Sequence, residues 1–278
     1  MNFEVDRIII NALIEDMPEG DVTTDNLISD DSYSECRLIA KADGCLAGIE
    51  VFSRVFDHVE GSVEIEWHFS DGDLVKPGDL LANIKGNTKT ILKSERVALN
   101  ILQRMSGVAT TTKRFADILS DYKTSVYDTR KTTPGIRYLE KMAVRIAGGT
   151  NHRYSLSDMV MIKDNHIKAA GTMTNAVNTI KASVDPKIKV EVEAEDLEMV
   201  KEALTLDVDV IMLDNMSIED MAKAVVMAKG HKCLLEASGN MGSKSASELV
   251  EVAKTGVDYI SVGDLTHSYT SLDISLKF

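Results

Sequence analysis

The second half of the chain repeats a short β-branched run followed by an amphipathic helical stretch, and this alternation constrains the fold most strongly. From about Lys113, six runs (SVYDT, DMVMI, KIKVEVE, DVDVIML, KCLLEAS and DYISV) alternate with helical segments such as DLEMVKEALTL and SASELVEVAKTG. Strand–helix units with short connections predict parallel strands and right-handed crossovers. No Gly-x-Gly-x-x-Gly follows the first strand, which counts against a dinucleotide-binding fold. An α/β barrel is the better prediction.

The first 110 or so residues have a different pattern, typical of an α+β unit. IIINALIEDM has helical periodicity, whereas ECRLIAKADGCLAGIEVF and SVEIEWHF indicate strands. ILKSERVALNILQRM predicts a helix with one buried face, and Arg96 lies at the edge of that face. The chain is therefore expected to form two domains.

Composition and charge exclude several classes of protein. The 278 residues are 44% hydrophobic and carry a net charge of −13, so neither nucleic acid nor an anionic membrane surface is an expected partner. No apolar run approaches the roughly 18 residues that span a bilayer, and the acidic N-terminus does not resemble a secretory signal. The three cysteines form no C-x-x-C pair, which argues against a disulfide scaffold or a cysteine zinc site and fits a cytoplasmic location.

One segment of this acidic chain is basic. Between Arg130 and Lys168 there are eight lysines and arginines against three acids, a local balance of +5. A basic segment on an acidic protein suggests a binding site for a small anion.

The residues that follow the predicted barrel strands are sorted by charge. They are Arg130 and Lys131, Lys163, Glu193, Asp214, Ser238-Gly239, and Gly263. The carboxyl ends of barrel strands form the active site, where cations bind carboxylates or phosphates and a pair of carboxylates can hold Mg²⁺. Glycine-containing turns after the last two strands match the common phosphate site of barrels. The alternative is that these are charges of solvated loops.

The segment DTRKTTPGIRYLEKMAVRIAGGTNHR resembles the quinolinate phosphoribosyltransferase family. The resemblance continues through VMIKDNHI, VEVEAEDLE, IMLDN, LEASGN and DYISVGDLTHS, and it reaches upstream to DGDLVKPGDLL and ERVALNILQRMSGVAT. It covers nearly the whole chain in order, and DTRKTTPG with NHR and IKDNHI is highly specific as a set.

The resemblance implies an α/β protein with an N-terminal α/β sandwich domain over residues 1–112. An incomplete α/β barrel of six or seven strands would follow over 113–268, and the tail 269–278 could return to the first domain. It also implies a homodimer whose active site is shared between subunits. The implied reaction joins quinolinate to 5-phosphoribosyl-1-pyrophosphate and releases CO₂ and pyrophosphate, giving nicotinate mononucleotide in NAD biosynthesis.

The resemblance also assigns roles to particular residues. The dicarboxylate pocket would consist of Arg130, His152, Arg153 and Lys163, with Arg96 from the partner subunit. Lys131 would contact the phosphoribosyl substrate, and Glu193 and Asp214 match the acidic pair near the ribose and the Mg²⁺–pyrophosphate group. The loops implied to hold the 5-phosphate are Ser238, Gly239 and Asn240, and Gly263 and Asp264. The family's last loop usually reads Val-Gly-Ala, so VGD is a departure, and the Asp264 side chain is expected to turn to solvent.

Three alternatives remain open from the sequence. Glu191 and Glu193 alternate with valines on one strand, and Glu193 is preferred as the inward residue because it ends the strand. A Schiff-base aldolase would use Lys163 as its nucleophile. A ligand-binding relative, of the molybdenum-operon type, would have a phosphate loop altered by Asp264.

Overall fold

The computed structural model describes residues 3–278, which form two compact units. Of the described residues, the first unit contains 3–113, 132–148 and 265–278, and the second contains 114–131 and 149–264. Within the described residues, no helix is both long enough and apolar enough to cross a membrane.

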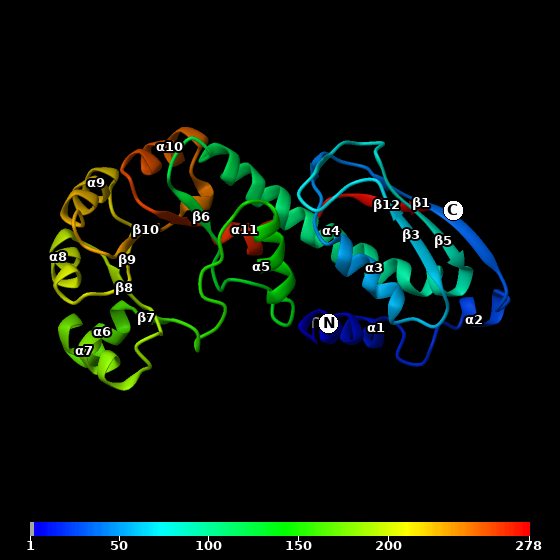
Figure 1. Ribbon diagram of the computed structural model, residues 1–278, viewed down its shortest axis with the longest axis horizontal. Coiled ribbons are helices and arrows are strands. Elements are labelled where there is room, and N and C mark those ends of the chain that lie inside the picture. The colour runs from blue at the N-terminus through cyan, green and yellow to red at the C-terminus, as the bar shows by residue number, and fades with distance from the viewer. Residues whose placement is uncertain (1–2) are drawn as a thin grey trace. The chain divides into compact units, whose positions relative to one another are not determined.

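The first unit is built on an antiparallel sheet in the order β12-β1-β5-β3. Its strands are β1 (Tyr33–Ala40), β3 (Val63–Trp67), β5 (Leu80–Asn87) and β12 (Ile274–Lys277), and β2 (Gly44–Cys45) pairs with β4 (Leu74–Val75). Helices α1 (Phe3–Asp16), α2 (Thr24–Leu27) and α3 (Ile49–Asp57) belong to this unit, and α4 (Thr88–Ile118) begins in it. Strand β12 completes the sheet, so residues from both ends of the chain meet there (Figure 1).

Helix α3 shows how the core of the first unit forms. Val51, Phe52, Val55 and Phe56 lie on one stripe and are buried. The ring of Phe52 meets Trp67 of β3 edge to face, with 5.4 Å between centroids, so α3 packs on the sheet. Each such side chain contributes about 1.5–3 kcal/mol by leaving water.

Residues 132–148 group with the first unit, which differs from the expected 113–268 barrel domain. This segment contains α5 (Arg137–Ile146), whose apolar face is buried. Its buried Glu140 accepts hydrogen bonds from Arg104 of α4 and, at 2.9 Å, from the backbone N–H of Thr133. A buried carboxylate needs such partners, and both belong to the first unit rather than to the barrel, one on α4 and one within the segment itself.

The second unit is a six-stranded parallel sheet in the order β6-β11-β10-β9-β8-β7. Its strands are β6 (Ser125–Tyr127), β7 (Val160–Ile162), β8 (Val190–Ala194), β9 (Val210–Asp214), β10 (Leu234–Ser238) and β11 (Tyr259–Ser261). β6 and β7 follow one another in the chain but lie at opposite edges of the sheet. In a closed barrel they would be neighbours, so this is a barrel opened at one place, and the predicted incomplete α/β barrel is confirmed with six strands.

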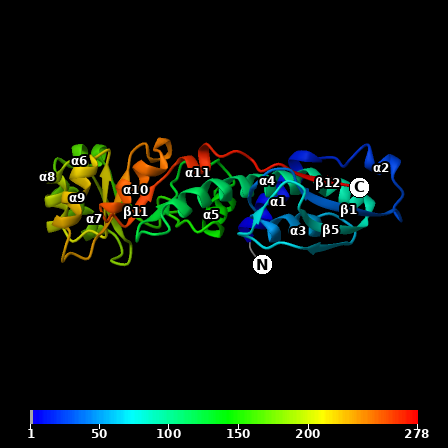
Figure 2. The same cartoon turned by 90° about the horizontal axis from the view of Figure 1, so that it is seen from above.

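Helices lie outside the curved sheet (Figure 1). They are α6 (Asp164–Ala170), α7 (Met173–Ser183), α8 (Leu197–Thr205), α9 (Ile218–Met227) and α10 (Ala246–Lys254), with the 3₁₀ turn η1 (Met241–Ser243) before α10. The short helix α11 (Asp264–His267) follows β11, and all of it after Asp264 groups with the first unit. Successive helices from α6 to α9 contact each other, as Figure 2 shows from above. Side-chain oxygens of Thr172, Asp196, Ser217 and Ser245 cap α7, α8, α9 and α10.

Candidate active site

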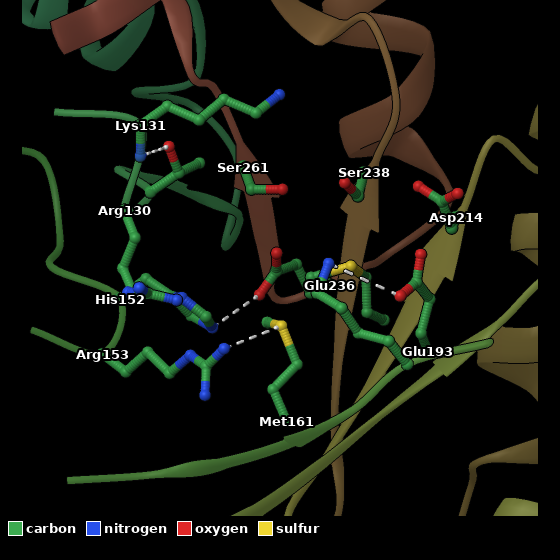
Figure 3. A pocket seen from close by; sticks show the side chains of 13 residues that line it. Arg130, Lys131, His152, Arg153, Met161, Glu193, Asp214, Glu236, Ser238 and Ser261 are labelled. Carbon is green, nitrogen blue, oxygen red and sulfur yellow. Dashed lines mark hydrogen bonds and ion pairs between the residues drawn. The ribbon is translucent and has the colours of Figure 1, made fainter. Parts of the chain in front are cut away.

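A cavity of about 420 Å³ opens inside the curved sheet of the second unit. It is lined mainly by residues at the carboxyl ends of the strands: Thr129, Arg130, Lys131, His152, Arg153, Met161, Lys163, Glu193, Met212, Asp214, Glu236, Ser238 and Ser261. In Figure 3 the cations Arg130, Lys131 and Arg153 lie on one side, Glu193 and Asp214 lie on the other, and Glu236 lies between them.

The strand register explains which side chains reach this cavity. Side chains alternate between the two faces of a strand, so Glu191 and Glu193 share a face while Val190, Val192 and Ala194 are buried on the other. Glu193 pairs with Met212, which pairs with Glu236, and Asp214 pairs with Ser238. The interior of the open barrel is therefore lined mainly by polar residues, with Met212 between Glu193 and Glu236 in the same layer.

The cationic side of the cavity comes from three different segments. Arg130 and Lys131 follow β6, Arg153 precedes β7, and Lys163 follows β7. The guanidinium of Arg153 donates to the carbonyl of Met159 at 3.1 Å, and both burial and the nearby positive charge of Arg130 lower its pKa. Two guanidinium groups close enough to repel each other favour a shared anion between them.

Lys163 lies beside the acidic side of the cavity. Ile162 pairs with Val192, so the next residue of each strand is Lys163 beside Glu193, and their charged groups are 3.7 Å apart. The lysine side chain is 47% exposed. The structure thus brings Lys163 to the cavity, although as a half-exposed group at its rim.

Glu193 and Asp214 form the predicted acidic pair on neighbouring strands. The pKa of Glu193 is raised, chiefly by burial and partly by the negative charge of Asp214, and Lys163 opposes this shift. The Oε2 atom of Glu193 is buried and makes no hydrogen bond to the described residues. Asp214 accepts a hydrogen bond from the side chain of Asn215 at 2.8 Å. A buried carboxylate oxygen that accepts no hydrogen bond, with a lysine ammonium only as near as 3.7 Å, and a second carboxylate beside it form a donor set that fits a hard divalent cation such as Mg²⁺.

His152, Glu191 and Glu236 form a buried cluster, and His152 and Glu236 also line the cavity. His152 Nε2 lies 2.6 Å from a carboxylate oxygen of Glu191 and 3.8 Å from one of Glu236. Burial raises the pKa of both carboxyls, and the negative charge of Glu191 raises that of Glu236 further. Tyr127 packs against the His152 ring and stacks on Tyr259 at 3.8 Å, so aromatic side chains adjoin the cluster.

The His152 segment is held in the opening of the barrel. Thr150 forms an isolated parallel bridge with Tyr127, and its N–H donates to the carbonyl of Val126 at 2.8 Å. The buried carboxylate of Asp128 then accepts the backbone N–H of His152 at 2.8 Å. The aspartate of the DTRK motif thereby fixes the backbone that carries His152 and Arg153.

The first predicted phosphate loop packs against the acidic pair. Ser238 lines the cavity, and the backbone N–H of Asn215 donates to its carbonyl at 3.0 Å. Gly239 has φ of +104° and lies so close to Asn215 that a Cβ would overlap its side chain. Asn240 is exposed and also has a positive φ. Gly239 and Asn240 are not among the residues that line the cavity.

The expectation that Asp264 turns to solvent is wrong. Asp264 is half-buried at the start of α11, and a Cβ built on Gly242 would overlap its carboxylate. The side chain therefore packs against the 3₁₀ turn that follows the first phosphate loop. Because Gly242 has no side chain, the carboxylate has room there. Neither Gly263 nor Asp264 is among the cavity-lining residues.

Arg96 lies on α4 and is exposed. It belongs to the first unit, and its expected role in the site of a partner subunit stays a prediction.

Sequence reasoning missed Glu236, Asp128 and the inward position of Glu191. It considered the residues just past each strand, whereas Glu236 lies within LLEAS and is 1% exposed. The signal was present, because a carboxylate between apolar neighbours of a buried strand must have a partner. The sequence analysis treated Glu191 and Glu193 as alternatives for the inward-facing residue, but both face the interior. Residues two apart on a strand point to the same face, and here Glu191 lies deeper and Glu193 lies at the mouth of the cavity.

Comparisons with known proteins agree with this architecture. Residues 21–106 match the model of the quinolinate phosphoribosyl transferase N-terminal domain, and residues 108–277 match that of the C-terminal domain. A probable nicotinate-nucleotide pyrophosphorylase [carboxylating] from Synechocystis is 40% identical over 275 residues, covering 98% of this chain and 92% of that protein. The Bacillus subtilis protein of the same name is 38% identical, covering 99% and 93%.

Solved structures are similar along the whole chain. The crystal structure of NadC from Streptococcus pyogenes has a TM-score of 0.94 at 41% identity and covers 100% of this chain and 97% of that one. The nicotinate-nucleotide pyrophosphorylase from Francisella tularensis has a TM-score of 0.92 at 38% identity, covering 100% and 96%.

Proposed function

Because the chain belongs to the quinolinate phosphoribosyltransferase family, we propose that it is a carboxylating nicotinate-nucleotide pyrophosphorylase. It is a pentosyltransferase that joins quinolinate to 5-phosphoribosyl-1-pyrophosphate and releases CO₂ and pyrophosphate, forming nicotinate mononucleotide in NAD biosynthesis. The observation that carries this proposal is the cavity itself, which has cations from three chain segments on one side and a carboxylate pair on the other.

Quinolinate is a small dianion, and the cationic side of the cavity suits it. Arg130 and Arg153 can each bind a carboxylate through two parallel hydrogen bonds, and Lys163 adds a charge at the rim. Several fixed charges on one rigid ligand determine its orientation as well as its affinity. The ring nitrogen would then face the ribose of the second substrate, whose contacts include Lys131.

The acidic side of the cavity suits the phosphoribosyl substrate. As pyrophosphate leaves, positive charge develops on the ribose, and the carboxylates of Glu193 and Asp214 stabilise it. Mg²⁺ bound with the pyrophosphate group would be held by the same two residues and would neutralise the leaving group. The loops at Ser238, Gly239 and Asn240 and at Gly263 and Asp264 would hold the 5-phosphate.

Attack by the ring nitrogen gives a cationic pyridinium, which makes loss of the adjacent carboxylate feasible because the carbanion left at C2 is an ylide. No covalent bond to the protein is required, so Lys163 acts as a charge partner rather than a nucleophile. Its pairing with Glu193 at 3.7 Å supports this role.

We further propose that the enzyme acts in the cytoplasm as a homodimer in which Arg96 reaches the active site of the partner subunit. The free cysteines Cys36, Cys45 and Cys233 fit a reducing compartment. An exposed arginine on α4 fits a role outside its own subunit.

The deciding experiment is incubation with both substrates and Mg²⁺, following CO₂ and nicotinate mononucleotide together. Equal amounts of the two products are expected, and each requires both substrates. Formation of neither product by folded protein would refute the proposed function. Trapping with borohydride and a carbonyl substrate should give no adduct at Lys163, and an adduct would favour the aldolase alternative instead.

A further inference from the structure

Glu236 is a buried acid at the centre of the cavity for which the mechanism above has no role. It lies within β10, is 1% exposed and contributes to the cavity lining between the cationic and the acidic sides (Figure 3). Neither of its carboxyl oxygens has a well-formed hydrogen bond to another described residue, and His152 Nε2 lies 3.8 Å from one of them. A charged carboxylate in this position would be very costly.

The surroundings of Glu236 favour its protonated form. Burial and the adjacent negative charge of Glu191 raise the pKa of Glu236 to about 8, against the opposing effect of His152. Binding of a dianion favours the same form, because an ionised Glu236 would repel the substrate carboxylates. The protonated form is therefore the favoured form of this side chain, which lies between the cationic and the acidic sides of the cavity.

The proposed reaction needs a proton at this place. When CO₂ leaves, the electron pair of the broken bond remains on C2 of the pyridinium ring, and C2 must take up a proton to give nicotinate mononucleotide. Arg130 and Arg153 cannot supply it, because guanidinium groups keep their protons at any ordinary pH. Lysine, with a reference pKa of about 10.4, is a weaker acid than a carboxyl raised to about 8.

We propose that Glu236 is the acid that protonates C2 after decarboxylation; this inference rests on the proposed function. The bond between C2 and its carboxylate breaks, CO₂ leaves, and its electron pair stays on C2. That pair takes the proton from the Glu236 hydroxyl, forming the C2–H bond and leaving Glu236 as a carboxylate. The cationic pyridinium stabilises the new carboxylate, and a proton from water restores the acid before the next turnover.

A metal ion in the buried cluster is a weaker interpretation of the same residues. His152, Glu191 and Glu236 could in principle ligate an ion. However, His152 Nε2 and the Glu191 oxygen are 2.6 Å apart, whereas two ligands of a tetrahedral zinc ion lie about 3.3 Å apart. A separation of 2.6 Å is that of a short, direct hydrogen bond, which favours contact between the two side chains over a metal ion held between them.

Other ionisable groups adjoin Glu236, and each bears on its pH dependence. They are Glu191 on β8, His152 before β7, Tyr259 on β11, Tyr127 on β6, and the cavity groups Arg130, Lys131, Arg153, Lys163, Glu193 and Asp214. A loss of activity at alkaline pH can therefore be assigned to Glu236 only if substitution of this residue alone removes it.

The test compares Glu236→Gln with the full-length wild type. Glutamine keeps the shape and neutrality of the protonated acid but cannot donate its proton in the same way. Quinolinate affinity measured by calorimetry should stay within about threefold, and first-turnover pyrophosphate release should persist. Nicotinate mononucleotide formation should fall about 100-fold or more, because general acids contribute about 10²–10⁴-fold. Glu195→Gln, the same change at an exposed carboxyl past β8, is the matched control and should behave as wild type.

The pH profile gives a second readout. Wild-type product formation should decline as the pH rises through about 8, since the donor is then ionised, and Glu236→Gln should lack this decline. Product formation within threefold of wild type by Glu236→Gln would overturn the proposal. So would a parallel loss of quinolinate affinity, pyrophosphate and product, because that pattern indicates a structural role.

A second variant and the wild-type result separate a failure of this proposal from misfolding and from a failure of the proposed function. If circular dichroism shows that Glu236→Gln is unfolded, Glu236→Asp decides instead: it must shift the alkaline limb while quinolinate affinity is retained, and an unshifted limb would overturn the proposal. A wild-type protein that forms neither product would refute the proposed function rather than the role of Glu236.

Discussion

Removing the Asp128 carboxylate should release the segment that carries His152 and Arg153. Asp128 is fully buried, and its Oδ1 accepts the backbone N–H of His152 at 2.8 Å. Asp128→Ala removes this acceptor and leaves a buried amide without a partner. A hydrogen bond to a charged group contributes about 1.5–3 kcal/mol, and an unsatisfied buried donor costs about 1–3 kcal/mol. Since these terms overlap, we expect a total loss of about 2–3 kcal/mol.

The loss should appear in binding as well as in stability. If misalignment of His152 and Arg153 reduces the binding free energy of quinolinate by about 2 kcal/mol, the affinity should weaken about 30-fold. Urea unfolding measures the stability, and calorimetric titration with quinolinate measures the affinity.

Asp128→Asn is the matched control, because its side-chain oxygen can still accept the His152 amide. It should lose less than half as much in both measurements. An Asp128→Ala variant that unfolds at the wild-type urea concentration and binds quinolinate with wild-type affinity would show that this hydrogen bond does not position the segment.

Four further predictions concern charge, assembly, the metal ion and packing. Lys163→Ala should abolish turnover while the circular dichroism spectrum stays unchanged, whereas wild-type activity would remove this residue from the site. Mixing inactive Arg96→Ala and Lys163→Ala subunits should restore up to about a quarter of wild-type activity if the active sites are shared between subunits. Half of the dimers are then mixed, and each mixed dimer has one site with both residues intact. No recovery after subunit exchange would contradict shared sites. Removing divalent cations with a chelator should stop turnover until Mg²⁺ is added back, and full activity without it would exclude the metal. Gly107→Ala should lower the free energy of unfolding by about 1–3 kcal/mol, because a Cβ at this position would overlap the Thr270 carbonyl. This loss is expected even though alanine favours the helix over glycine by about 1 kcal/mol. An unchanged denaturant unfolding curve would contradict the prediction.

The period of hydrophobic residues was sufficient to predict the barrel. Each of the six β-branched runs includes all, or all but the last residue, of one strand of the second unit, because buried parallel strands need apolar residues on their outer face regardless of the loops. The opening between β6 and β7 was implied only by the family resemblance, since a local pattern contains no information about which edges pair.

The residues at strand ends were predictable for the same reason, because the carboxyl ends of parallel strands meet at one edge of the sheet. The buried residues below these strand ends were not predictable from the sequence in this way. Glu236 and Asp128 interact with groups that are distant in the chain, and only the register brings Glu191 and Glu236 to the same interior face. The side chain of Asp264 was mispredicted because its position depends on the missing side chain at Gly242.

The position of β12 beside β1 has a consequence for biosynthesis. Residues 33–40 leave the ribosome early, yet their edge partner, residues 274–277, is made only after the whole barrel sequence. During this interval β1 presents an open edge, on which another nascent chain could add a strand. The barrel unit contains no strand from outside its own range. It can therefore finish folding first, and the N-terminal unit, although translated earlier, is the one that finishes last.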